Sequence, residues 1–332
     1  MKILVTGATG FLGRSVVNKL LERHVAHARL VGRSVNEETV RTMKARFPRT
    51  TIEWCLGDLT DHEFVEQIVE GMDIVYHLAA GMRGNGPELI FNTAVGTDTL
   101  FSALRRQQVT RVVLVSSFAV YGLTRASWNC VLDEYAPVEL HPERRDPYTY
   151  AKLKQEQLLK KYGLPGVIVR PGVLYGEGGP ALSARVGLKV GPLFLHLGGR
   201  AWLPLTYVEN CADAIVLAGL KDKINGQIIN IVDDQLMRAH QYRRRYSREV
   251  TRLRSITIPY PLLMLLSSAL LKYHRASHGQ LPAVLTPYKV AAAWKHCRFD
   301  NSKAKRLLGW QPKISLQEAL RRTFESLRQA AK

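Results

Sequence analysis

The first twenty-one residues of the chain constrain its fold more than any other segment. Lys2 to Thr6 form an apolar, β-branched run, which predicts a buried strand. Glycines follow at three-residue spacing, Gly7, Gly10 and Gly13, and apolar residues at positions 16, 17, 20 and 21 then share one face of a helix. A strand, a glycine turn and a helix predict the first unit of a layered α/β fold.

The glycine turn also predicts a phosphate site. Gly7 permits the tight turn, Gly10 lets the backbone approach a pyrophosphate, and Gly13 lets the helix lie close to the sheet. The helix N-terminus faces the phosphates. The spacing is GxxGxxG rather than the commoner GxGxxG. We expect a dinucleotide to contact Gly7, Thr9, Gly10, Phe11, Leu12 and Gly13.

The end of the second predicted strand bears on which dinucleotide binds. Ala28 to Val31 read as a strand, and Gly32-Arg33-Ser34 follow where an NAD-binding chain carries an acidic residue for the ribose 2′-hydroxyl. No carboxylate is present to repel a 2′-phosphate, and Arg33 can pair with one. The sequence therefore favours NADP over NAD.

Strands and helices alternate through the first half of the chain. Further strands are predicted at 52–56, 74–78, 111–115, 167–170 and 227–232, and helices at 64–69, 88–108 and from 208. The alternation predicts an α/β fold, a Rossmann-like doubly wound parallel sheet with a smaller C-terminal substrate lobe. We expect a nucleotide-binding domain over 1–170 and the lobe over 171–332, with about 203–232 returning to the sheet.

A tyrosine and a lysine one helical turn apart predict acid/base chemistry. Tyr148 and Lys152 project to one side of a predicted helix, and Ser117 follows the strand at 111–115. A nearby ammonium favours the phenolate, so Tyr148 could exchange a proton while a nicotinamide moves a hydride. Ser117 could hydrogen-bond the substrate oxygen. Tyr150 is only two residues from Lys152 and would face away.

Taken together, these motifs resemble the extended short-chain dehydrogenase/reductase family along nearly the whole chain. The matching stretches are TGATGFLG at 6–13, GDLT at 57–60, HLAA at 77–80, NTAVGT at 92–97, VSSFAVYG at 115–122, YTYAK at 148–152, RPGVLYG at 170–176, YVENCADAI at 207–215 and LLGWQP at 307–312.

The resemblance implies roles for individual residues. It makes Ser117, Tyr148 and Lys152 the catalytic triad, with Tyr148 and Lys152 also at the cofactor. The other cofactor contacts that it implies are Asp58 and Leu59 at the adenine, Ala79 and Ala80 at the nicotinamide ribose, Asn92, Ser116, and Pro171, Gly172 and Val173 beside the nicotinamide. For Asn92 helix packing, and for Ser116 a core hydroxyl, stay open as alternatives.

The substrate is less constrained than the chemistry. Dehydratases of the family carry Thr-Asp-Glu where this chain has Ser117-Phe118-Ala119, so dehydration is disfavoured. The C-terminal part resembles the 3β-hydroxysteroid and sterol 4-carboxylate dehydrogenase branch, which implies a sterol-like, lipid-like or other bulky substrate. A nucleoside-diphosphate-sugar epimerase and, more remotely, a cofactor-sensing protein without activity are the alternatives.

Composition limits the compartment and the partners. Four scattered cysteines without a CxxC pair predict neither disulfides nor a metal site, and Met1 leads straight into a strand, so we expect a cytoplasmic chain without a signal peptide. The net charge of +19 favours anionic partners, although no nucleic-acid motif is present. We expect a small-molecule substrate and a homodimer.

An apolar segment at 256–271 lies between clusters of basic residues. It is too short to span a bilayer. Three interpretations remain open: a lid over an apolar substrate pocket, a core helix, and peripheral contact with an anionic membrane.

Overall fold

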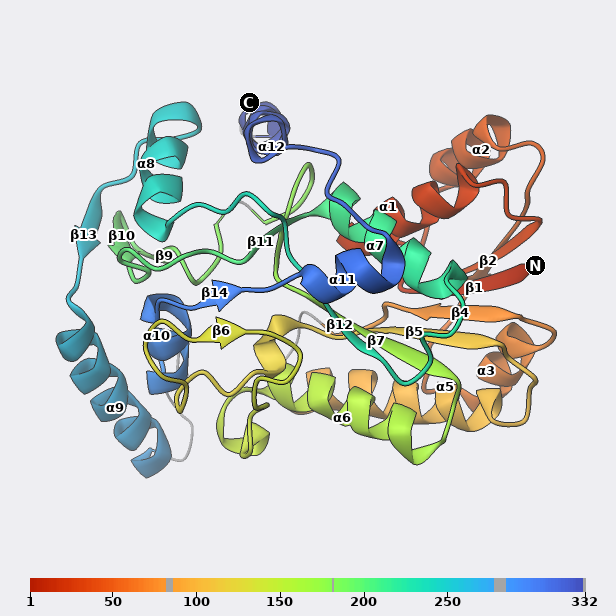
Figure 1. The fold of residues 1–332 in the computed structure, drawn as a ribbon, viewed down its shortest axis with the longest axis horizontal. Helices are drawn as coiled ribbons and strands as arrows, with labels where there is room; N and C mark the ends of the chain where they lie inside the picture. The colour runs from red at the N-terminus through yellow and green to blue at the C-terminus, as the bar shows by residue number, and fades with distance from the viewer. Residues whose placement is uncertain (82–85, 181, 278–284, 331–332) are drawn as a thin grey trace.

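A seven-stranded parallel sheet lies at the centre of the molecule (Figure 1). The computed structural model describes residues 1–81, 86–180, 182–277 and 285–330. The strand order is β12-β7-β5-β4-β1-β2-β3. Its strands are β1 (Lys2–Thr6), β2 (His27–Gly32), β3 (Thr51–Leu56), β4 (Ile74–His77), β5 (Arg111–Val115), β7 (Gly166–Pro171) and β12 (Ile228–Ile231).

Helices cover both faces of this sheet, which confirms the doubly wound Rossmann-like fold (Figure 1). On one face pack α1 (Phe11–Leu21), α7 (Val208–Leu220) and α11 (Ser302–Leu308). On the other pack α3 (His62–Val69), α5 (Gly96–Leu104) and α6 (Pro147–Lys161), while α2 (Glu37–Arg46) follows β2. The predicted strands and the helix from 208 are all present.

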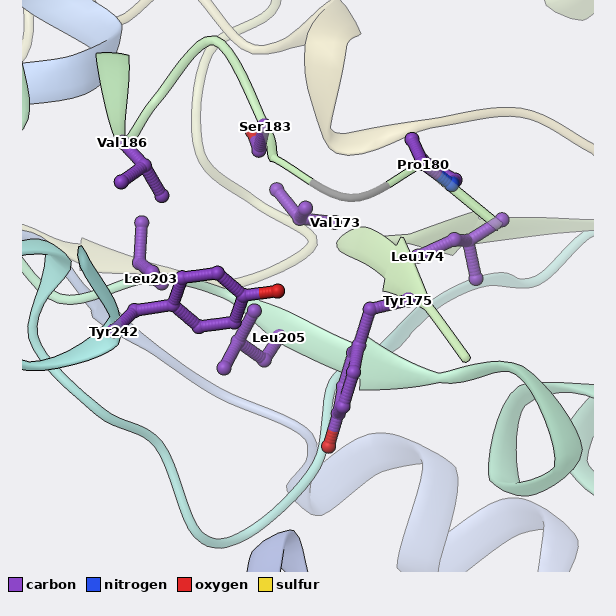
Figure 2. Close-up of a pocket in the computed structure, with 9 residues that line it drawn as sticks. All are labelled: Val173, Leu174, Tyr175, Pro180, Ser183, Val186, Leu203, Leu205 and Tyr242. Atoms are coloured by element: carbon purple, nitrogen blue, oxygen red, sulfur yellow. The ribbon is translucent and has the colours of Figure 1, made fainter. Parts of the chain in front are cut away.

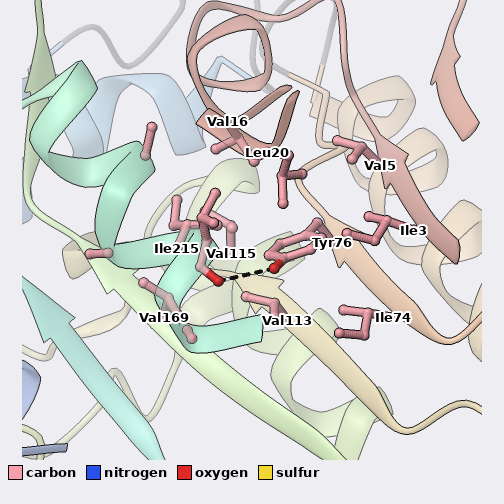
Figure 3. Packing of buried hydrophobic residues seen from close by; sticks show 14 of the residues in the cluster. Ile3, Val5, Val16, Leu20, Ile74, Tyr76, Val113, Val115, Val169 and Ile215 are labelled. Atoms are coloured by element: carbon pink, nitrogen blue, oxygen red, sulfur yellow. Dashed lines mark hydrogen bonds between the residues drawn. The ribbon is translucent and has the colours of Figure 1, made fainter. Parts of the chain in front are cut away.

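One buried tyrosine joins the sheet to the helix layer above it. Figure 3 shows Tyr76 of β4 among apolar side chains, with its hydroxyl donating to the Val216 carbonyl of α7 at 3.0 Å. A Cβ at Gly219 would lie 2.0 Å from the Tyr76 oxygen, so glycine is required there. This contact fixes α7 across β4 and beside α1.

The helix expected over 88–108 differs from the observed structure. It consists of α4 (Gly86–Ile90), a π-helical turn η1 (Phe91–Val95) and α5. Inside it, the Thr97 hydroxyl donates to the Thr93 carbonyl at 2.6 Å, and the Thr93 hydroxyl accepts the Gly81 N–H at 2.8 Å. These side-chain bonds stabilise the wide turn, a kind of irregularity that is frequent at functional sites.

The C-terminal part adds small sheets and helices. Two of the small sheets have two parallel strands each. In one, β8 (Val173–Tyr175) pairs with β11 (Leu205–Tyr207), and in the other β6 (Val131–Leu132) pairs with β14 (Arg298–Phe299). A third sheet contains β9 (Gly187–Val190), β10 (Leu193–His196) and β13 (Ser255–Thr257). The remaining elements are η2 (Phe118–Val120), η3 (Pro142–Arg144), α8 (Ala239–Glu249), α9 (Tyr260–Ala276), α10 (Pro287–Trp294) and α12 (Leu316–Ala330). Within the described ranges, no helix has both the length and the apolar character to cross a bilayer.

Candidate active site

The candidate site lies where the strand order reverses, at the carboxyl ends of β1 and β4, and we call this edge of the sheet the crevice. Chain connections leave these two neighbouring strands in opposite directions, which is where ligands bind in open α/β sheets. Gly7 follows β1 with a φ of 72°, and a Cβ there would lie 2.8 Å from the Ala79 nitrogen that follows β4. The glycine turn and the HLAA stretch therefore meet directly, as the sequence predicts.

The start of α1 suits a phosphate group. Gly10 is its N-cap, is exposed, and brings no side chain to cap the first turn, which contains no acidic residue. No side chain therefore accepts a hydrogen bond from the N–H groups of that turn, which lie at the positive end of the helix dipole. A Cβ at Gly13 would lie 2.0 Å from the Gly7 oxygen, so the turn requires glycine there. These features fit a bound dinucleotide pyrophosphate.

Two residues predicted to contact the dinucleotide, Phe11 and Leu12, direct their side chains toward the C-terminal part of the chain. These side chains pack against the cluster formed by β8, β11, α8 and α12. A Cβ at Gly179 would touch the Phe11 ring at 2.4 Å. For Phe11 and Leu12, only the backbone is placed to meet a phosphate.

The residues predicted to contact the adenosine part of the dinucleotide follow β2 and β3, further along the crevice from the glycine turn. Arg33 is exposed just beyond β2, and Gly32 lies against Thr9, where a Cβ would come within 2.9 Å of that side chain. Past β3, Asp58 is exposed and its Oδ1 accepts from the Thr60 nitrogen and hydroxyl, each at 2.9 Å. Leu59 packs against Gly96 of α5.

Ser117 and Tyr148 lie close to each other, further along the crevice toward β5 and α6. Ser117 follows β5, and its Oγ accepts from the Ala119 nitrogen at 3.1 Å. Tyr148 stands in the first turn of α6, which begins at the N-cap Asp146. Burial raises the pKa of the Tyr148 phenol, the hydrogen bond with Ser117 lowers it, and the net shift is upward. Tyr148 is therefore a neutral proton donor at pH 7.

Lys152 lies one turn further along α6 and is buried. Its Nζ donates to the Val115 carbonyl at 2.8 Å and to the Gln155 Oε1 at 2.9 Å. Burial lowers the pKa of Lys152 to about 8, against the opposing effect of Glu156. The ammonium expected to act on Tyr148 is thus held by a backbone carbonyl and an amide in this structure.

A buried polar network connects Lys152 with the glycine turn. Gln155 Nε2 lies 2.7 Å from the Thr97 hydroxyl and 3.0 Å from His77 Nε2, while His77 Nδ1 lies 2.7 Å from the Thr6 hydroxyl. Burial, together with the charge of Lys152, lowers the pKa of His77 to about 3, so this ring is neutral. Sequence reasoning missed Gln155, although its place three residues after Lys152 on a helix was a usable signal.

A buried ion pair between Glu156 and Arg170 lies one helical turn beyond Lys152 on α6. Glu156 accepts from Arg170 Nε at 2.9 Å and Nη2 at 2.6 Å, and from the Ser116 hydroxyl at 2.5 Å. That Ser116 contacts the cofactor stays a prediction, and in this structure its side chain donates to the ion pair. The alternative, a core hydroxyl, fits the structure.

The remaining predicted contacts lie around the crevice. Ala79 and Ala80 follow β4, and Asn92 is part of η1. Pro171 ends β7, and a Cβ at Gly172 would lie 2.3 Å from the Pro204 oxygen.

Val173 lines a small pocket on the lobe side. Figure 2 shows it with the side chains of β8, β11 and α8 that converge there, and the wall comprises Val173, Leu174, Tyr175, Pro180, Ser183, Val186, Leu203, Leu205 and Tyr242. At about 20 Å³ this pocket has room for one water molecule. It cannot hold a bulky substrate without opening.

Comparisons with known proteins agree with this geometry. A 3beta-hydroxysteroid-dehydrogenase/decarboxylase isoform 1 of Arabidopsis thaliana is 28% identical, over 97% of this chain and 79% of its own. A sterol-4-alpha-carboxylate 3-dehydrogenase, decarboxylating, of Mus musculus is 28% identical over 98% and 90%. The solved UDP-glucuronic acid 4-epimerase of Bacillus cereus in complex with NAD covers 100% of both chains, with a TM-score of 0.69 at 23% identity, which shows the shared fold.

A family model covers most of the chain. The model described as the NAD dependent epimerase/dehydratase family matches residues 3–231, which include every residue of the crevice described above. The chain therefore belongs to the NAD dependent epimerase/dehydratase family and is an NAD(P)-dependent enzyme, a dehydrogenase/reductase or an epimerase.

Proposed function

We propose that this enzyme interconverts a secondary hydroxyl and a ketone on a bulky apolar substrate of the sterol or lipid kind. The observation that carries the proposal is the placement of Ser117 and Tyr148 close to each other, with Lys152 one turn along α6, at the crevice that the glycine turn and β4 form. A hydride acceptor bound at that turn supplies the redox step. The protein's own groups need only orient the substrate and move one proton.

Each proposed catalytic residue has one role. Tyr148 Oη gives a proton to the substrate oxygen in reduction and takes it back in oxidation. Ser117 Oγ hydrogen-bonds the same oxygen, where charge develops. Lys152 supplies a positive charge below pH 8 that favours loss of the Tyr148 proton, and its ammonium would also help to hold a ribose hydroxyl of the cofactor.

The relatives support the substrate class. Two of the relatives that align along nearly the whole chain are named as dehydrogenases of hydroxysteroids or sterol carboxylates. Phe118 and Ala119 occupy the positions where an acid and a base would be needed for dehydration.

A substrate screen tests this function. The purified enzyme with NADP or NAD is offered 3β-hydroxysteroids, long-chain 3-hydroxy acids and nucleotide-sugars, and absorbance at the reduced-nicotinamide band is followed. We expect stoichiometric reduced cofactor with a hydroxysteroid or lipid alcohol. An isomerised nucleotide-sugar without net reduced cofactor would instead establish an epimerase.

We further propose that the cofactor is NADP. The exposed Arg33 beyond β2 can pair with a 2′-phosphate, and no carboxylate stands beside it in Gly32-Arg33-Ser34. We expect Arg33→Asp to weaken NADPH binding by at least about tenfold, because a charge-assisted hydrogen bond of roughly 1.5–3 kcal/mol is replaced by repulsion. Fluorescence titration with NADPH and NADH measures both affinities, and equal affinities in the parent enzyme would refute the preference.

A further inference from the structure

Helix α9 has two apolar faces, and only one of them packs on the protein. Its inner face contributes Leu263, Met264 and Tyr260 to a cluster with β9, β10 and α10. Its outer face carries exposed apolar side chains at helical spacing: Leu262 (46%), Leu265 (67%), Leu266 (42%), Leu270 (48%) and Tyr273 (57%). We call these five residues the outer stripe.

The neighbouring sheet extends this apolar surface. Val190, Leu193 and Ile256 are exposed by 55%, 38% and 49%. In the register of β9, β10 and β13, they share a face with Leu188 and Leu195, which pack against α9. The exposed part of this sheet face and the outer stripe therefore both flank the buried cluster around Leu263.

The segment that carries the outer stripe is almost entirely basic among its charged residues. Glu249 is the only acidic residue between Gln235 and Phe299 in the sequence, and ion pairs tie it to Arg245 and Arg248. The exposed basic side chains of this segment include Arg244, Arg248, Arg252, Arg254 and Lys272. Figure 1 shows α8, β13 and α9 along one end of the molecule, opposite the N-terminal strands. Lys272 also follows Leu265 by seven residues, so it lies on the same face of α9 as the outer stripe.

We propose that the outer stripe docks on an anionic lipid surface. An apolar helix face flanked by arginines and lysines matches the acyl boundary and the negative headgroups of such a membrane. Of the alternatives left open by the sequence, a core helix fails because the stripe is exposed. A lid over the catalytic residues fails because α10 lies between: its Tyr288 and Ala292 pack near Phe118, while its Val290 and Ala293 pack with Leu263.

The position of α9 gives the docking a functional consequence. One helix, α10, separates the docked surface from the loop that carries Ser117. An apolar substrate dissolved in the bilayer would therefore enter close to the crevice. The docking itself does not depend on which substrate is used, so its test is independent of the activity assay.

Vesicle co-sedimentation of the full chain tests the proposal. The probes are phosphatidylcholine vesicles with and without about one-third phosphatidylglycerol, at low and at high NaCl. We expect binding to the anionic vesicles that is at least about tenfold tighter than to the neutral ones and that weakens with salt. Absence of binding to anionic vesicles, or equal binding to both kinds, would overturn the proposal.

Matched substitutions identify the surface. Leu265→Glu should weaken vesicle binding by at least about tenfold, because an exposed leucine that docking would bury is replaced by a charge of the membrane's own sign. Leu140→Glu alters a leucine of similar exposure (63%) between β6 and α6 and should leave binding unchanged. Arg252→Ser combined with Arg254→Ser should weaken it by on the order of tenfold. Equal losses in Leu265→Glu and Leu140→Glu, or a dimer that Leu265→Glu converts to monomer, would show that the stripe does not dock on lipid.

Discussion

Tyr148→Phe is expected to lower turnover by about 10³-fold, within the range of 10²–10⁴ that a positioned acid or base contributes. The substitution removes the hydroxyl that we propose exchanges a proton with the substrate, and it keeps the ring in the first turn of α6. NADPH binding should persist, because the glycine turn lies on a different element. Steady-state kinetics and a fluorescence titration measure the two quantities separately.

Tyr150→Phe is the control for this experiment. Tyr150 lies on the same helix, two residues from Lys152, and so points to a different side of α6 than Tyr148. It should retain nearly full turnover. Unchanged turnover in Tyr148→Phe with intact NADPH binding would mean that the catalytic assignment is wrong.

The sheet and its crevice could be predicted from sequence because their signals are local. β-branched runs define the strands, and the glycines at 7, 10 and 13 are needed for a turn and a close approach that only backbone can make. The carboxyl ends of parallel strands share one edge, so motifs that follow strands meet there.

The contacts of Lys152 and Ser116 could not be predicted because they depend on how α6 is rotated over β5. That rotation directs the Lys152 ammonium to Val115 and Gln155, and it directs Glu156 to Ser116 and Arg170. The break at η1 likewise depends on a bond between Thr97 and Thr93. In α9, apolar residues on both faces leave no periodic signal of which face is exposed.

Glu156→Gln is expected to lower the free energy of unfolding by about 3–5 kcal/mol, the usual loss when one partner of a buried ion pair is removed. The side chains of Glu156 and Arg170 are 6% and 3% exposed. Burial alone would lower the pKa of Arg170, but its bonds to Glu156 outweigh burial and hold the pKa above the usual value. A glutamine keeps the shape but leaves the guanidinium without a counter-charge. Urea denaturation followed by circular dichroism measures the loss.

Two further variants separate the charge of this pair from its packing. Ser116→Ala removes one hydrogen bond to the carboxylate and should cost about 1–3 kcal/mol, less than Glu156→Gln. Joining Glu156→Leu to Arg170→Leu removes both charges, so the double variant should lose less stability than its two single changes added together. Strict additivity would mean that the two groups do not interact. A loss below about 1 kcal/mol in Glu156→Gln would mean that water reaches the pair, because an exposed pair contributes only that much.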